Sequence, residues 1–461
     1  MPAFPTALTA ELRGLLGESH VISAGDSLET LSKDYYWYSP ILKPQLDDKR
    51  ADLIARPGSV EALRAVLAAC FAAGVAVTPR GGGTGNYGQC VPLHGGVVLD
   101  LTRLDRIHSV ADGVVRAEPG ARLGSIETAA RAAGWELRCY PSTWMKATLG
   151  GFFGGGAGGI GGIRWGGIAS GDTVKSLTIL TCEAAPRTLR YEGAAAMTAL
   201  RTFGTTGLMV EIEMRLAPKI DYDQLAFSSS DWEKLLAWTD TVGRHGAWRK
   251  RVVSQFQWPI PSYFKPLQKH LRTDEHLSLL LVDRAQTDAV VASAATAGLA
   301  CVYRRPLSDP PKPPFLSDFT FNHTTLWAMK TDPTITYVQA NFSPDFRAQI
   351  AALHARFPGE ILMHLEWGAL DPSRPSDPAA IGVGAIPLIR YRSEARLMEI
   401  FDFGATIGVN LRNTHSYHLT ATTPDGTAAR HALKYDVDPR GLLNPGKMNS
   451  FPLNPFAAPA R

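Results

Sequence analysis

Residues 79–86, which read PRGGGTGN, are the first segment whose composition could do chemistry. Consecutive glycines allow backbone N–H groups to converge on an anion without obstruction by Cβ atoms, and Arg80 adds a positive charge. This combination suits a pyrophosphate. The segment is not the GxxxxGK[ST] of a P-loop, and no helix begins where the GxGxxG of a Rossmann site requires one. Taken alone, it is also compatible with a tight structural turn.

A second glycine-rich stretch covers residues 141–166. It reads PST at 141–143, TLGG at 148–151, GGGAGG at 154–159 and WG at 165–166. Each glycine costs about 0.5–1 kcal/mol of backbone entropy relative to alanine, so a purely structural loop would rarely contain so many. We therefore expect a long, flat ligand to lie against this backbone.

The elements around the two loops must hold them against that ligand. Ser59 is a typical helix N-cap, apolar residues follow it at helical spacing, and Gly74 ends the predicted helix. Residues 75–78 form a predicted strand that leads into the first loop, whereas residues 142–168 are expected to be irregular. After Pro218 glycine becomes rarer, and amphipathic helices alternate with strand-like segments, which predicts a second domain built on an antiparallel sheet.

Length and composition restrict the class of protein. The chain has 461 residues, of which 45% are hydrophobic and 20% charged, as in a globular protein of two or three domains. A net charge of +4 is too small to indicate nucleic acid or an anionic membrane as the main partner. We see no signal peptide and no apolar run long enough to span a bilayer, and we expect a cytoplasmic protein. The five cysteines form no CxxC pair, which argues against a disulfide framework and against an iron–sulfur cluster.

Two further segments, FGTTGL at 203–208 and GLLNPGK at 441–447, complete a recognisable series. In this order and spacing the segments resemble the FAD-binding oxidoreductases of the vanillyl-alcohol oxidase, or PCMH-type, fold, and within them the branch of D-lactate dehydrogenase and the D-type chain of glycolate oxidase. That family's PRGxGTG, GGVVLDL, VEPG, GTLGIVTEATLRL and LNPGK are matched at 79–85, 95–101, 117–120, 204–216 and 443–447. The resemblance is strong over about 55–218 and 438–448 and weak between them.

The resemblance implies FAD as the cofactor and assigns roles to the matched residues. Residues 80–85 would hold the pyrophosphate, residues 141–143 and the second glycine series would line the flavin, residues near 207–210 would meet the adenine, and the tail would close over the flavin. The implied FAD-binding residues are Pro79, Arg80, Gly81, Gly82, Gly83, Thr84, Gly85, Pro141, Ser142, Thr143, Gly150, Gly151, Gly156, Gly158, Gly159, Gly207, Leu208, Val210, Asn444 and Lys447. Some relatives attach the flavin to a histidine at the position of Thr84, so non-covalent FAD is expected here.

Oxidation of a C–H carbon also requires a proton acceptor and an anchor for the substrate. Residues 410–418 (NLRNTHSYH) form the densest polar cluster, and we choose His415 as the base or orienting group, with His418 and Arg412 as substrate-binding candidates. His415 is the counterpart of the histidine in the family's GEHG segment, although a hydrogen-bonded loop histidine is an equally good interpretation. Lys330 occupies the arginine position of the family's LWxxR and can bind a carboxylate, but without a bidentate fork.

We predict no metal site, although His364 and Glu366 lie near the family's metal-binding HxGDGNxH segment and leave that alternative open. The predicted fold is α+β: a PCMH-type FAD-binding domain of two subdomains (1–218), an antiparallel-sheet cap domain (219–410) and a C-terminal segment that returns to the FAD domain (411–461). The predicted activity is that of a flavoprotein, an FAD-linked oxidase or dehydrogenase that oxidises a CH–OH group, of 2-hydroxy acid type, by hydride transfer to flavin N5.

Several alternatives remain open from the sequence. One is an aryl-alcohol or sugar-alcohol oxidase on the same fold, a second is a flavin-binding subunit of a larger redox complex, and a weaker third is a nicotinamide-dependent dehydrogenase. The electron acceptor could be oxygen, a quinone or a carrier protein. The sequence does not specify the substrate or exclude a homo-oligomer.

Overall fold

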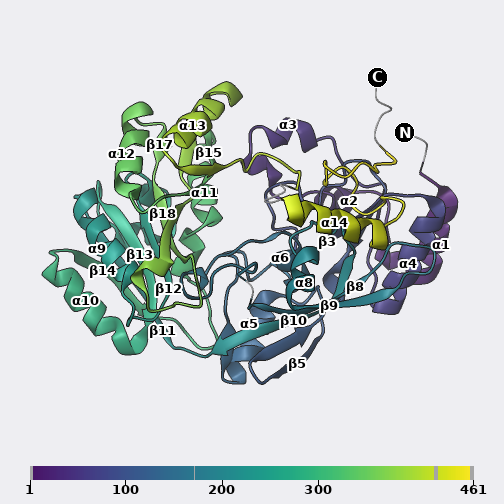
Figure 1. The fold of residues 1–461 in the computed structure, drawn as a ribbon, viewed down its shortest axis with the longest axis horizontal. Coiled ribbons are helices and arrows are strands. Elements are labelled where there is room, and N and C mark those ends of the chain that lie inside the picture. The colour runs from purple at the N-terminus through teal and green to yellow at the C-terminus, as the bar shows by residue number, and fades with distance from the viewer. Residues whose placement is uncertain (1–3, 171, 420–423, 457–461) are drawn as a thin grey trace.

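Two lobes make up the part of the chain that the computed structural model describes, residues 4–170, 172–419 and 424–456 (Figure 1). The first lobe carries two sheets, and the second, which we call the cap, begins with strand β11 (Tyr222–Ser229). Helix α14 (Pro424–Val437), drawn in yellow, lies on the first lobe although it follows the cap in sequence. Among these described residues, no helix has the length and apolarity needed to cross a membrane.

A four-stranded sheet forms one half of the first lobe. Its central strands are parallel, because β2 and β3 both pair with β4 in the same direction. Helix α4 (Val60–Ala73) packs its apolar face into this core, and its ends are those predicted: the Ser59 side chain accepts from the Ala62 amide, and Gly74 is left-handed at φ 67°. The strands, in spatial order, are β1 (Val21–Ile22), β2 (Leu53–Ala55), β4 (Val97–Asp100) and β3 (Val77–Arg80).

An antiparallel sheet forms the other half, with the long strand β10 (Leu208–Pro218) at its centre. The other strands are β5 (Ile107–Ala111), β6 (Val114–Ala117), β7 (Trp135–Leu137), β8 (Val174–Leu180) and β9 (Thr188–Glu192). Helices α5 (Leu123–Ala132) and α8 (Gly193–Ala199) pack against this sheet. The glycine-rich stretch, which we predicted to be irregular, contains two short helices, α6 (Leu149–Gly155) and α7 (Gly162–Trp165); α6 is capped by the Thr148 side chain.

The cap is built on an eight-stranded sheet in which every pairing is antiparallel, as predicted. Its strands, in spatial order, are β14 (Ala300–Pro306), β11, β13 (His276–Asp283), β12 (Lys250–Phe256), β18 (His364–Ala369), β19 (Ile381–Ala385), β16 (Gln339–Asn341) and β21 (Asn410–Arg412). A small second sheet contains β15 (Ile335–Tyr337), β20 (Leu388–Arg390) and β17 (Ile361–Leu362). The cap helices are α9 (Trp232–Arg244), α10 (Thr287–Thr296), α11 (Asn322–Met329), α12 (Phe346–Arg356) and α13 (Glu394–Thr406).

The tail leaves the cap through β21 and rejoins the first lobe beside β3. Val77 bridges to Leu443 in parallel, the Val77 amide donates to Leu442 O, and the Asn444 amide donates to Val77 O. The GLLNPGK segment therefore extends the sheet next to the strand that ends at the first glycine loop.

Buried ion pairs join the two lobes. Arg251, on cap strand β12, lies 3.3 Å from Glu127 and 3.4 Å from Glu136 of the first lobe, and it donates to Leu137 O at 2.7 Å. All three charged side chains are almost fully buried. Removal of one partner would leave an uncompensated buried charge, so this contact fixes the cap relative to the first lobe.

Candidate functional site

A cavity of about 1490 Å³ lies between the two lobes. It exceeds the roughly 300–1,000 Å³ of ordinary small-ligand pockets, so it has room for a long cofactor together with a substrate. Both glycine-rich segments, residues 203–209, helix α11 and residues 410–419 contribute to its wall. Motifs that are far apart in sequence therefore surround one space.

The backbone of the first glycine loop is arranged to receive an anion. Within the described residues, none of the amides from Gly81 to Asn86 donates a hydrogen bond to another protein group, yet all six residues line the cavity. Most of these residues are only partly buried, so their amides are free to donate to an anionic ligand in the cavity. The residues present therefore fit the pyrophosphate of FAD.

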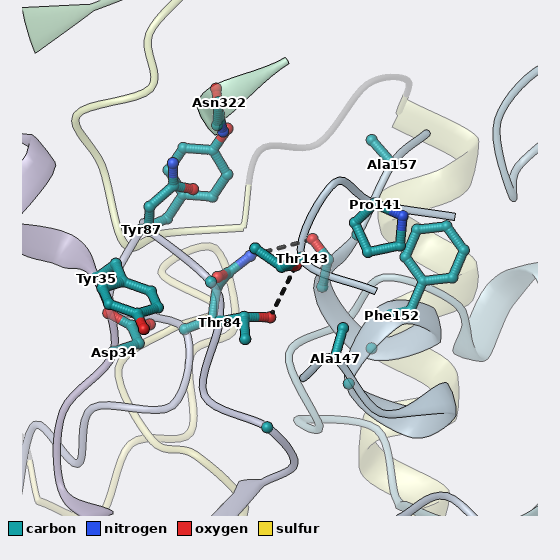
Figure 2. Close-up of a pocket in the computed structure, with 18 of the residues that line it drawn as sticks. Asp34, Tyr35, Thr84, Tyr87, Pro141, Thr143, Ala147, Phe152, Ala157 and Asn322 are labelled. Atoms are coloured by element: carbon teal, nitrogen blue, oxygen red, sulfur yellow. Dashed lines mark hydrogen bonds between the residues drawn. The ribbon is translucent and has the colours of Figure 1, made fainter. Parts of the chain in front are cut away.

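Close packing explains why this loop consists of glycine. A Cβ atom at Gly81 would lie 2.2 Å from Thr148 Oγ1, and one at Gly82 would lie 2.3 Å from Lys146 O. The two glycine-rich segments thus press backbone against backbone, and any side chain would push them apart. Figure 2 shows Thr84, which follows the three glycines, pointing toward Thr143, with their hydroxyl oxygens 3.3 Å apart.

Behind the loop lies a buried polar cluster whose carboxylate, Asp34, was not predicted from the sequence. Asp34 accepts from the amides of Tyr36 and Gly88, at 3.0 and 3.2 Å, and Lys447 Nζ donates to Gly88 O at 2.5 Å. Burial raises the pKa of Asp34 and lowers that of Lys447, while each charge opposes the shift of the other. The Arg80 guanidinium also turns to this side, because it donates to Lys33 O at 2.5 Å and to Cys90 Sγ at 3.3 Å.

Most of the predicted FAD-binding residues line the cavity. They are Pro79, Arg80, Gly81, Gly82, Gly83, Thr84, Gly85, Pro141, Ser142, Thr143, Gly150, Gly151, Gly156, Gly158, Gly159, Gly207 and Leu208. Val210, Asn444 and Lys447 do not line it: Val210 belongs to the apolar core, whereas Asn444 and Lys447 hold the loop from behind. Asn444 Nδ2 donates to both Gln89 O and Phe203 O at 2.8 Å, which ties two lining segments together.

Where the first lobe meets the cap, the cavity wall is polar and carries residues that were not predicted from the sequence. The Tyr87 hydroxyl accepts from Gln339 Nε2 at 2.9 Å, and Figure 2 shows Asn322 of α11 beside it. Burial raises the pKa of Tyr87, so the phenol stays protonated at neutral pH. Tyr87 directly follows the PRGGGTGN segment. That proximity was the only feature of the sequence that could have identified Tyr87 as a cavity residue.

The two tail histidines have different surroundings. His415 does not line the cavity; it is buried, its Nδ1 lies 2.7 Å from Ser39 Oγ, and burial lowers its pKa to about 4. His418 lines the cavity, and its Nδ1 lies 3.1 Å from Gly446 O. Since a carbonyl oxygen only accepts, Nδ1 must carry the proton, which leaves the lone pair on Nε2. Nε2 of His418 bonds to none of the described residues.

Lys330 and Arg412, the other two predicted substrate-binding residues, both line the cavity. Lys330 Nζ lies 4.0 Å from the Trp327 ring centroid, and Arg412 ends strand β21, opposite Gln339. His323 also faces this space; burial first, and then the charges of Lys330 and Lys146, lower its pKa to about 4.

His364 and Glu366 lie in the cap sheet and interact with each other, with His364 Nε2 2.7 Å from Glu366 Oε1. The same carboxylate accepts from the Phe321 amide at 2.9 Å and from Ser254 Oγ at 2.5 Å. The Glu366 carboxylate is therefore already occupied by hydrogen bonds, and these bonds fix the turn that leads into α11. Over residues 4–170, 172–419 and 424–456, no three potential metal ligands of the His, Cys, Asp or Glu type cluster.

Comparison with known proteins agrees with this geometry. Residues 51–189 match the family model described as an FAD binding domain. The chain is 24% identical over 239 residues to an uncharacterized FAD-linked oxidoreductase of Mycobacterium tuberculosis, an alignment that covers 50% of each protein. It is 25% identical over 439 residues to D-2-hydroxyglutarate dehydrogenase of Xanthomonas citri pv. viticola, covering 86% of this chain and 88% of that one.

A shorter alignment, 27% identical, joins 39% of this chain to 37% of the glycolate oxidase subunit GlcD of Escherichia coli. Among solved structures, alkyldihydroxyacetonephosphate synthase superposes with a TM-score of 0.69 at 14% identity, over 97% of this chain and 87% of that one, which shows a common fold. The chain spans about half the length of the Mycobacterium relative. Together, these matches show an FAD-binding domain at residues 51–189 and a similarity of the chain to FAD-linked oxidoreductases.

Proposed function

We propose that the protein uses non-covalent FAD to oxidise the CH–OH group of a small 2-hydroxy acid. The observation that carries this proposal is one cavity whose lining includes both a row of unpaired loop amides and the cationic side chains of Lys330 and Arg412. FAD, when bound, supplies a two-electron acceptor at flavin N5. The names of the relatives, D-2-hydroxyglutarate dehydrogenase and glycolate oxidase among them, support this substrate class.

Residues of the chain bind the substrate and accept its proton. Lys330 and Arg412 line the cavity and bind the anionic substrate, with Lys330 on its carboxylate. The lone pair on His418 Nε2 accepts the hydroxyl proton as the carbon gives up its hydride, and Gly446 O keeps that tautomer in place. His415, our first choice of base from the sequence, supports the tail segment through its contact with Ser39. The cap excludes bulk water from the reacting carbon.

The proposal can be tested with the purified holoenzyme under anaerobic conditions. A panel of electron donors is added, and reduction is followed as bleaching of the flavin absorbance band. Lactate, glycolate and longer 2-hydroxy acids should reduce the flavin, and benzyl alcohol and sugar alcohols should not. Reduction by an aryl or sugar alcohol alone would contradict the substrate class. The electron acceptor that reoxidises the flavin is a separate question, and oxygen, a quinone and a carrier protein are all candidates.

A further inference from the structure

Helix α11 presents one of its faces to the cavity. The α11 residues that line the cavity recur at intervals of three and four positions, as one face of a helix requires. Asn322 and His323 make the start of this face polar, and Lys330, directly after the helix, makes its end cationic. Between them, Leu326 and Trp327 form an apolar step. No part of the proposed reaction uses these two side chains.

The apolar step belongs to a larger apolar surface. Leu326 and Trp327 pack against a buried hydrophobic cluster of the cap, and so does Ile386, which follows β19. All three are partly buried and line the cavity, so the area that the cluster leaves uncovered is open to a ligand. Tyr38, a member of the cluster itself, also lines the cavity. Small-molecule sites are typically lined by such surface, with a few polar groups that fix the orientation of the ligand.

The indole ring of Trp327 has a fixed position. Its Nε1 donates to Asp318 O at 3.0 Å, and the ring stacks on Phe319 with the ring centroids 5.5 Å apart. The Lys330 ammonium lies 4.0 Å from the centroid of the same indole. A cation–π contact of this kind keeps the lysine charge beside apolar surface. The cation that anchors the substrate carboxylate therefore adjoins the apolar step directly.

Helix geometry sets the distance between these two parts of the site. Leu326 and Trp327 precede Lys330 by four and three positions, and an α-helix rises about 1.5 Å per residue. The apolar step therefore lies roughly 5 Å from the lysine along the axis. A carbon chain covers that distance in about four bonds of roughly 1.5 Å each. An apolar group about four bonds from the carboxylate carbon would thus meet the step.

The step has no hydrogen bond to offer to a second polar group. The one donor that Leu326 and Trp327 carry, the indole Nε1, already donates to Asp318 O. Asp318, an acidic residue, itself lines the cavity beside the indole. A carboxylate placed against the step would lose its hydration without gaining a partner, a cost that an apolar group does not have.

We propose that the preferred substrate is a 2-hydroxy acid with a single carboxylate and a large apolar side chain, branched or aromatic. This inference rests on the proposed function and specifies its substrate. Lys330 binds the carboxylate, and Leu326 and Trp327 contact the apolar side chain.

Two acids of the same shape separate charge from size. 2-Hydroxy-4-methylvalerate and malate have the same number of heavy atoms and differ in an isopropyl group against a second carboxylate. The holoenzyme should show a kcat/KM for 2-hydroxy-4-methylvalerate about tenfold or more above that for lactate, because it adds three carbons and each buried carbon contributes about fourfold. Malate should be a poorer substrate than 2-hydroxy-4-methylvalerate. A preference for malate would overturn the proposal.

Substitutions at the step test whether Leu326 carries this preference. Leu326→Ala should reduce the preference for 2-hydroxy-4-methylvalerate over lactate by about tenfold, the value of one to two buried carbons. Leu326→Met, which keeps an apolar side chain of similar volume, should retain it. Leu370→Ala, at a leucine that is 73% exposed and lies outside the cavity, is the matched control. The same preference in Leu326→Ala as in the wild type would contradict the proposal.

A binding measurement keeps the step separate from the reaction. 4-Methylvalerate and succinate have no hydroxyl to oxidise, and their binding can be followed by the perturbation of the oxidised flavin spectrum. Tighter binding of 4-methylvalerate that is lost in Leu326→Ala supports the proposal even if no donor reduces the flavin, in which case only the proposed function fails. Equal or tighter binding of succinate overturns the proposal.

The dissociation constant of FAD, measured by flavin fluorescence, decides whether the step serves the substrate or the cofactor. It should be the same in Leu326→Ala as in the wild type. Loss of FAD from this variant, with folding retained by circular dichroism, would assign the apolar step to the flavin ring and overturn the proposal.

Discussion

At the scale of single residues, hydrogen bonding gives two neighbouring histidines different surroundings, and our proposal gives them different tasks for that reason. Both come from the same nine-residue polar segment, and the sequence ranked His415 first. In the folded protein His415 is enclosed beside Ser39, while His418 reaches the cavity with its protonation fixed by Gly446 O. Alternation along a strand could not reveal this, because the segment beyond Arg412 is not an extended strand.

We therefore expect His418→Gln to slow flavin reduction by a 2-hydroxy acid by about a hundredfold or more, the range of a lost general base. His415→Gln should retain a rate near that of the wild type and lower thermal stability instead, because a buried contact is lost. Stopped-flow reduction at 450 nm and thermal unfolding measure the two effects; the wavelength, about 450 nm, follows from flavin chemistry. A His415 variant with full stability and no reduction would reverse the assignment.

The pH dependence of reduction follows from the same residue. Burial lowers the pKa of His418 from its ordinary value of about 6.5, so the ring is neutral and able to accept a proton at pH 7. The reduction rate should be flat from pH 8 down to about 6.5 and should fall only at lower pH, as the ring becomes protonated in the free enzyme. A half-maximal rate above pH 7 would exclude His418 as the acceptor.

At the scale of secondary-structure elements, the glycine loops show what sequence reasoning could and could not supply. The N-cap at Ser59, the left-handed Gly74 and the strand before the first loop follow from local patterns, and the order of motifs predicts the FAD domain. The short helix α6 was missed because glycines in a helix contradict local propensity, and packing against the first loop overrides it. Asp34 was missed because only the fold brings it beside Lys447.

The steric fit of the loop gives a prediction with a close control. Gly82→Ala places a methyl group 2.3 Å from Lys146 O and should abolish FAD binding or weaken it by orders of magnitude. Gly154→Ala changes another cavity-lining glycine with nothing within 4 Å of the new Cβ, and it should bind FAD nearly as the wild type does. Isothermal titration of the apoproteins with FAD measures both. Equal affinity in the two variants would show that the loop does not approach the cofactor.

At the scale of the whole molecule, the cavity exists because two lobes are held in a fixed relation. Arg251 of the cap fits between Glu127 and Glu136 of the first lobe, and burial raises the pKa of Glu136 while Arg251 opposes that shift. Arg251→Ala should lower the free energy of unfolding by about 3–5 kcal/mol, because Arg131 then remains as the one buried cation beside the carboxylates of Glu127 and Glu136. Urea denaturation is the measurement, and Arg305→Gln is the exposed control; a loss below about 1 kcal/mol would contradict this role for the contact.

The central claim is that the cavity between the lobes holds FAD without a covalent bond. The most direct test is an absorbance spectrum of the purified protein before and after acid precipitation. We predict a flavin band near 450 nm, about the usual position, that passes entirely into the supernatant. Colour that stays with the pellet would show a covalent link, with His323 and His418 of the cavity wall as the candidate attachment sites. A colourless protein that does not bind added FAD would contradict the account itself.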